Sequence, residues 1–452
     1  MRGRLRTAVV LLSPLLLFAS EANRSCPLGP SHSFDSAAMY RSVSATAEMV
    51  APSGTGGGRL RAVGVAPAGS AFPREVNFID RHLFGAMRSA GIVPAPIAGD
   101  EEFLRRVTLD LTGTIPDAQS VVDFVKDSSP DKRSRKIDEL LASEAFVDRW
   151  TMWFGDLVQN VSASSNVRLY SLGRNAYYNW IRDSIRARKP YDAMVRELLA
   201  GKGDNFTSGP ANYVVRQLQN NGPPQDTFDN LAAHSGEKFL GMPLLCLSCH
   251  DGAGHLELVN RGLQTKKRSD FWGMAAFFSR TTSRASRYTD PNNPNAFILR
   301  FDVADNTNGA YRLNTTSGNK TPRQPVAGGP DSVEPAYMFT GEKPRPGESY
   351  RDAYGRMLTG DRQFARAAVN YLWKEMFAIG IVEPVGGFDL ARLDPAALPP
   401  GQTLQPVNPQ LLEELTSEFI ALKYDLRGML RTIAMSSAYQ LSSKYPAGVW
   451  NE

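Results

Sequence analysis

The stretch SEAFVDRWTMWFGDLVQN, residues 143–160, decides the fold class of this chain. Its apolar residues recur every three or four positions, which is the period of an α-helix with one face against a core. Trp150, Trp153 and Phe154 share that spacing. Aromatic residues in this pattern usually pack in a protein core, although they could instead line a cofactor pocket. We therefore predict an amphipathic helix here, with a core beneath its aromatic face.

The same helical period extends on both sides of this stretch. It runs through residues 74–280, where segments begin at capping aspartates and end at glycines, and it returns over residues 346–452. Between about 281 and 345 the period disappears, and AFILRFDVADNTNGAYRLNTTSGN (296–319) alternates as strands do. We predict a mainly α protein whose two helical regions are joined by an irregular segment with a small β-hairpin.

Composition is that of a globular protein with two or three domains, because 452 residues exceed the size of one ordinary core. The formal net charge is +5, and residues 1–22 contribute three arginines and one glutamate, so +3 remains without them. This excess is too small to indicate nucleic acid as a partner. The basic clusters at 182–192 and 264–270 are expected to be solvated helix ends.

The N-terminus, MRGRLRTAVVLLSPLLLFASEAN, indicates export. Three arginines precede an apolar run over residues 8–19, and small residues follow at the end of the segment, so we predict a signal peptide over residues 1–22. The run is shorter than the roughly 20 residues that cross a bilayer, so we expect no transmembrane span in the mature chain, with an uncleaved anchor as the alternative. The expected location is the periplasm or cell surface. Residues 23–73, rich in Gly, Ser, Ala and Pro, are predicted to be a flexible tether.

The most informative motif is LCLSCHDGAGH, residues 245–255. Cys246, Cys249 and His250 form the C-x-x-C-H pattern of c-type haem attachment, in which two thiolates bond the haem vinyl groups and the histidine becomes an axial iron ligand. With three Cys and five His in the chain, the pattern would arise by chance on the order of once in 5,000 such sequences. Gly241 and Pro243 are expected to end the preceding helix and start the attachment turn. We predict one covalent haem c per chain.

Two other interpretations of the cysteines stay open. Cys246 and Cys249 could form a local disulfide in an oxidising compartment. Zinc is the other alternative, but it needs four ligands, and Cys246, Cys249 and His255 leave one position to be filled by His234 or a distant carboxylate.

The sixth iron ligand decides what a haem here would do, because a filled position makes an electron carrier and an open one makes a catalytic or gas-binding centre. His255 is a poor candidate, since a five-residue loop would have to pass round the macrocycle edge. Met274, in the apolar segment SDFWGMAAFFS, is the candidate sixth ligand. We expect an exported monohaem protein that transfers electrons, alone or as the redox partner of another exported enzyme. The alternative is a haem-free helical scaffold at the cell surface with a Cys246–Cys249 disulfide. No enzymatic activity is assigned.

Several segments resemble a known family pair. Those that resemble domain of unknown function 1549 (DUF1549) are FIDRHLFGAMRSAGIVPAP, EEFLRRVTLDLTGTIPDAQSVVDFV, KIDELLASEAFVDRW, NWIRDSIRARKPYDAMVRELLAG, FLGMPLLCLSCH and DFWGMAAFFSR. RQFARAAVNYLWKEMFAIGIVEPVGGFD and NPQLLEELTSEFIALKYDLRGMLRTIAMSSAYQ are similar to its usual downstream partner, DUF1553. The resemblance covers the chain from about residue 74.

This resemblance implies an exported bacterial protein, often combined with cytochrome-c or carbohydrate-binding modules, and it supplies no established reaction or substrate. Many members place a second histidine in a His-Pro-Phe-Asp run after the attachment motif, whereas this chain has DGAGHLE, which makes His255 an imperfect counterpart. The DUF1553-like region normally continues well beyond SSAYQ, so we expect residues 346–452 to be a shortened version of it.

Overall fold

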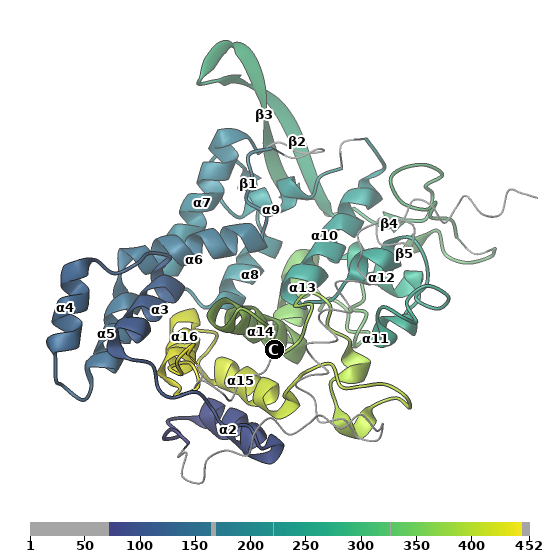
Figure 1. Cartoon of the computed structure of the whole chain (residues 1–452). Coiled ribbons are helices and arrows are strands. Elements are labelled where there is room, and N and C mark those ends of the chain that lie inside the picture. The colour runs from purple at the N-terminus through teal and green to yellow at the C-terminus, as the bar shows by residue number, and fades with distance from the viewer. Residues whose placement is uncertain (1–71, 164–168, 220, 326, 445–452) are drawn as a thin grey trace, which may run out of the picture. The chain divides into compact units, whose positions relative to one another are not determined.

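The computed structural model describes residues 72–163, 169–219, 221–325 and 327–444. The predicted signal peptide and nearly all of the predicted tether lie outside these residues. Figure 1 shows a mainly helical chain, which confirms the predicted fold class. The helices before the strands are α2 (Phe78–Ala90), α3 (Asp100–Thr112), α4 (Ala118–Lys126), α5 (Lys132–Ala142), α6 (Glu144–Leu157), α7 (Tyr170–Arg186), α8 (Tyr191–Leu199), α9 (Ala211–Arg216), α10 (Pro224–Phe239), the 3-10 helix η1 (Leu244–Ser248), α11 (Arg261–Gln264) and α12 (Arg268–Ala276).

The remaining elements follow in chain order, apart from one short early strand. The strands are β1 (Gly203–Asp204), β2 (Thr281–Asp290), β3 (Asn293–Asp305), β4 (Tyr311–Arg312) and β5 (Ser332–Val333). The last helices are α13 (Tyr350–Gly360), α14 (Arg362–Phe377), the 3-10 turns η2 (Leu390–Arg392) and η3 (Pro395–Ala397), α15 (Pro409–Ala421) and α16 (Leu426–Met435). Among the residues that the structure describes, no helix is long and apolar enough to cross a membrane.

Helix α6 forms where the aromatic spacing predicted it. The Ser143 side chain caps its first turn by accepting a hydrogen bond from the Phe146 N–H at 3.1 Å. Trp150 and Phe154 are fully buried on one face, and the Trp150 indole N–H donates to the Leu111 carbonyl of α3 at 3.1 Å. The aromatic residues therefore belong to the core, as one of the two sequence interpretations expected.

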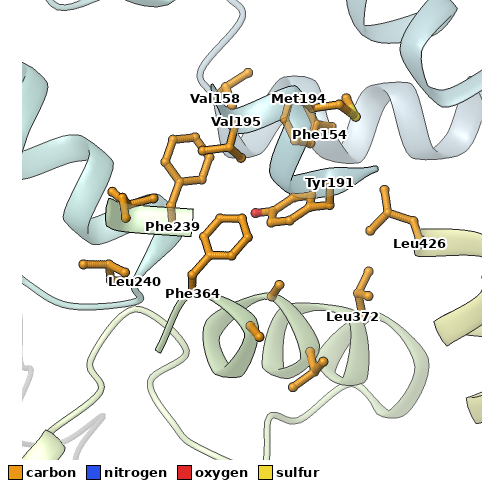
Figure 2. Close-up of a cluster of buried hydrophobic side chains, with 14 of the residues drawn as sticks. Phe154, Val158, Tyr191, Met194, Val195, Phe239, Leu240, Phe364, Leu372 and Leu426 are labelled. Carbon is orange, nitrogen blue, oxygen red and sulfur yellow. The ribbon is translucent and has the colours of Figure 1, made fainter. Parts of the chain in front are cut away.

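This core joins the two helical regions of the chain. Tyr191, at the start of α8, has its ring 6.0 Å from that of Phe154 on α6 and 5.3 Å from that of Phe364 on α14, measured between centroids. Figure 2 shows Tyr191 and Phe364 side by side within this buried cluster. Helices from before and after the strands thus bury their apolar faces against one another, which is where most of the hydrophobic stabilisation arises.

Polar contacts also link the first and last described helices. Asp80 of α2 is fully buried, and its carboxylate accepts backbone N–H bonds from Ser437 at 3.0 Å and Ala438 at 2.8 Å. Arg106 of α3 donates to the Tyr439 carbonyl at 2.8 Å. Helix α2 packs against α15, and α5 packs against α16. The described part of residues 50–452 therefore forms one compact unit, within which the predicted domain boundaries stay predictions.

The predicted hairpin is present, but its strands pair differently from the sequence expectation. The alternating stretch supplies most of β3, whose antiparallel partner is the preceding strand β2, in a register that joins Thr281 to Asp305 and Thr289 to Phe297. Strand β1 pairs with the other edge of β3. Most of β2 is exposed or half-buried, so its sequence TTSRASRYTD carries no apolar alternation that would have marked it as a strand.

Candidate functional site

A glycine turn delivers the chain from α10 into the cysteine motif. Gly241 has φ of 63°, in the left-handed region, and a Cβ at this position would lie 3.0 Å from the Val385 carbonyl oxygen. The Gly241 carbonyl in turn accepts a hydrogen bond from the Phe388 N–H at 2.8 Å. Only glycine combines this backbone conformation with so close an approach. The predicted helix break at Gly241 is confirmed.

The 3-10 helix η1, which carries Cys246, then packs back onto α10. Leu244 is fully buried over Gly236, where a Cβ would lie 2.2 Å from the Leu244 Cδ1 atom. Helix α12 also packs against both η1 and α10. The cysteine motif is therefore held on two helices rather than carried on a free loop.

Replacing Gly236 with alanine should destabilise the protein by about 1–3 kcal/mol, because the added methyl overpacks the contact between α10 and η1. Gly85 is the matched control: it lies within α2, and a Cβ there would have no neighbour within 4 Å. Gly85→Ala should stabilise the protein by about 0.5–1 kcal/mol through helix propensity. Urea unfolding monitored by circular dichroism measures both values. Equal effects of the two substitutions would contradict the packing of η1 on α10.

The structure brings Cys246, Cys249 and His250 together at the end of η1. The Cys249 N–H donates to the Cys246 carbonyl at 3.2 Å, and residues three apart lie on the same side of a 3-10 helix. Cys246 keeps only 7% of its surface exposed, whereas Cys249 and His250 are half-buried. Cys249 is a free thiol, with its Sγ 3.6 Å from the Ser248 hydroxyl.

The backbone fixes which nitrogen of His250 is available. Nδ1 lies 2.9 Å from the Asp251 carbonyl oxygen, which can only accept, so Nδ1 carries the hydrogen. In the neutral imidazole the lone pair is then on Nε2, which is how a metal-binding histidine is commonly oriented. The exposed His255 ring lies against the His250 ring in a tilted arrangement, with centroids 3.9 Å apart and planes 32° apart. Two cysteines and a histidine with a free Nε2 lone pair are the donor set that a c-type haem needs, and Cys249 is the more accessible of the two thiols.

Comparison with known families supports the sequence resemblance. Residues 78–283 match a family model described as protein of unknown function DUF1549. Residues 356–449 match a second family model, described as protein of unknown function DUF1553. The chain resembles the DUF1549 and DUF1553 proteins. No curated protein and no solved structure matched. The DUF1549 match runs from the start of α2 into β2 and includes the cysteine motif.

Met274, the predicted sixth ligand, lies on α12 in the DUF1549-like region. It is fully buried, and its helix packs against η1, so it belongs to the same part of the core as the cysteine motif. Its role as an iron ligand stays a prediction. Over the ranges that the structure describes, no three His, Cys, Asp or Glu side chains gather in a way that could hold a metal ion, so the ligand set of the zinc alternative is not assembled.

A buried ionic cluster lies beside the motif, and no local pattern in the sequence predicted it. Arg323 is fully buried and bonds Asp226 at 2.7 Å and Asp229 at 2.5 Å, both on α10. The Tyr311 hydroxyl donates to Asp229 at 2.7 Å. Burial raises the pKa of Asp229, and the Arg323 charge acts in the opposite direction. The cluster ties the segment around residue 323, which lies outside both matched regions, to the DUF1549-like helix α10.

The basic segment 264–270 differs from its sequence expectation. Arg268 was expected to be a solvated cation, but only 9% of its surface is exposed, and its Nε donates to the Ser248 carbonyl at 3.0 Å. Arg268 is the first residue of α12, where the helix dipole disfavours a positive charge, so its burial there depends on the carbonyls that accept its hydrogen bonds.

The difference in burial predicts how the two thiols react. In haem-free folded protein, iodoacetamide should alkylate Cys249 well before Cys246, because only the Cys249 side chain is substantially accessible. In denaturant the two should react alike. Peptide mapping by mass spectrometry measures each site separately. Equal native rates would contradict the burial of Cys246, and native resistance of both sites that a reductant removes would favour the local disulfide.

Proposed function

We propose that this chain is an exported c-type monohaem protein that passes electrons as the redox partner of another exported enzyme. The observation that carries the proposal is the C-x-x-C-H turn, in which the Asp251 carbonyl fixes Nδ1 of His250 and leaves Nε2 for a metal. The signal-like N-terminus supports the proposal, because this haem type is attached outside the cytoplasm. The expected location is the periplasm or the cell surface.

In this proposal Cys246 and Cys249 hold the haem by thioether bonds, and His250 is its axial ligand. A haem c bound here would supply a one-electron carrier. The chain's own backbone would hold the ligand in place, because the Asp251 carbonyl fixes the orientation of the His250 imidazole.

The proposal assigns electron transfer rather than catalysis, with Met274 as the proposed sixth ligand. Its helix α12 packs against η1, and a thioether ligand together with histidine raises a haem potential into the electron-transfer range. The partner is proposed to be a redox protein. With a charge of +3 after loss of residues 1–22, the chain offers no charge argument for nucleic acid.

The test is the visible absorption spectrum of the full chain, purified from the periplasm of a bacterium that expresses a c-type maturation system. We expect haem absorbance that survives acid-acetone extraction, as thioether bonds require, and that changes reversibly between oxidised and reduced protein. A control cytochrome c produced in the same cells shows that maturation works. Haem in the control and none in this chain would sink the proposal and favour the haem-free scaffold.

A further inference from the structure

The side chain of Arg268 lies directly behind the haem-attachment motif. Its Nε donates to the carbonyl of Ser248, which lies between Cys246 and Cys249, at 3.0 Å. Its backbone N–H donates to the Asp251 carboxylate at 2.7 Å. A single residue thus holds the turn on both sides of Cys249 and His250, from Ser248 to Asp251.

The other end of the guanidinium bonds a distant segment. Its two terminal nitrogens donate to the carbonyls of Pro322, at 2.9 Å, and Thr321. These residues directly precede Arg323, which is fixed to α10 by its buried bonds to Asp226 and Asp229. Helix α10 in turn packs against η1, which carries the start of the motif. The motif, Arg268, the segment 321–323 and α10 are therefore linked in one closed series of contacts.

The charge of Arg268 is also placed to act on the site. Its three side-chain hydrogen bonds all go to neutral carbonyls, and its guanidinium lies 4.9 Å from the centroid of the Trp272 ring. Only 9% of the Arg268 surface is exposed, so water screens its charge poorly. A buried positive charge next to a haem disfavours the ferric state, which carries one more positive charge than the ferrous state.

We propose that Arg268 is a positioning residue of the haem site, which fixes the C-x-x-C-H turn for attachment and raises the reduction potential of the iron. This inference rests on the proposed haem function. It concerns a residue that bonds the motif's backbone and is neither a thioether cysteine nor an axial ligand.

Two substitutions separate the geometric role from the electrostatic one. Arg268→Gln removes the charge, and Arg268→Lys keeps it while losing the planar fork that reaches three carbonyls at once. Arg261→Gln is the control, because Arg261 is a half-buried arginine of neighbouring α11 whose side chain bonds Gln264, at 3.3 Å. Each full-length variant is produced with the maturation system, and haem stain per chain and potential by spectroelectrochemical titration are measured.

In Arg268→Gln the potential should fall by ~59 mV, which is a tenfold change in the ferrous-to-ferric ratio. In Arg268→Lys the haem stain per chain should fall about tenfold, as for other losses of support to a metal ligand, while the potential of the haem-bearing fraction stays near that of the wild type. Arg261→Gln should match the wild type in both measurements.

An unchanged potential in Arg268→Gln, or an undiminished stain in Arg268→Lys, would overturn the inference. If Arg268→Gln accumulates no haem protein, the stain of Arg268→Lys decides the question. Absence of haem from the wild-type chain is a different result, which counts against the proposed function rather than against the role of Arg268.

Discussion

Replacement of both Cys246 and Cys249 with alanine should abolish covalent haem attachment, so that a denaturing gel stained for haem peroxidase activity shows no band. Both thioether bonds are lost, and non-covalent haem does not survive the gel. His250→Ala should behave differently in kind. The two sulfurs remain, so haem can still attach, but loss of the axial imidazole should change its spectrum and potential.

His255→Ala is the matched control for the His250 substitution. His255 lies in the same loop, and its exposed ring contacts the ring of His250. It is not the proposed axial ligand, so its loss should leave a wild-type-like spectrum. An unstained wild-type band beside a stained control cytochrome would refute haem attachment. Identical spectra for His250→Ala and the wild type would refute the assignment of His250 alone.

The second large effect is expected from Arg323→Leu, which leaves Asp226 and Asp229 buried without their cation. Breaking a buried ion pair by removal of one partner costs about 3–5 kcal/mol, because a carboxylate stays desolvated and uncompensated. Urea unfolding of the haem-free protein measures this loss. Arg312→Gln is the control: Arg312 is paired with Asp331 at 3.5 Å in an exposed position, and loss of such a pair costs about 0–1 kcal/mol.

The pH dependence of the Arg323→Leu defect provides a further check. Burial already raises the pKa of Asp229, and loss of the guanidinium removes the main opposing influence, so the pKa should rise further. In the folded variant the Asp229 carboxyl then keeps a proton at a pH at which the unfolded chain has released it. Lowering the pH from neutral therefore raises the free energy of unfolding of the variant. The defect should therefore be smaller at pH 5 than at pH 7. A defect that grows towards acid would contradict this account of the cluster.

Local patterns predicted the elements whose signals are periodic. The aromatic spacing of residues 143–160 gave α6 and its buried face, and the alternation before Asp305 gave β3, whose Phe301 and Val303 are buried. Strand β2 was missed because most of it is exposed or half-buried, so burial left no period in its sequence. Its pairing with β3 could not be inferred from the downstream residues alone.

The candidate site likewise contains residues that the sequence predicts and residues that it does not. Cys246, Cys249 and His250 are recognisable because their chemistry requires a fixed local spacing. Arg268 looked like one more surface cation, because its acceptors at residues 321 and 322 lie more than 50 positions away in sequence. Periodicity identifies which side of a helix is apolar, but it does not identify which distant segment covers it.

The contacts of Asp80 constrain when helix α2 can complete its packing. The Asp80 carboxylate accepts a local hydrogen bond from the Val76 N–H, but its bond to the Ser437 N–H spans 357 positions, so its full set of partners forms only when nearly all of the described sequence has been synthesised. Proteins dominated by such distant contacts fold slowly, since long loops must close before the contacts form. Helices α3 to α7 can pack on one another early, but the face of α2 that packs against α15 stays uncovered until the last helices have been made, so apolar surface of α2 remains exposed in the partly synthesised chain.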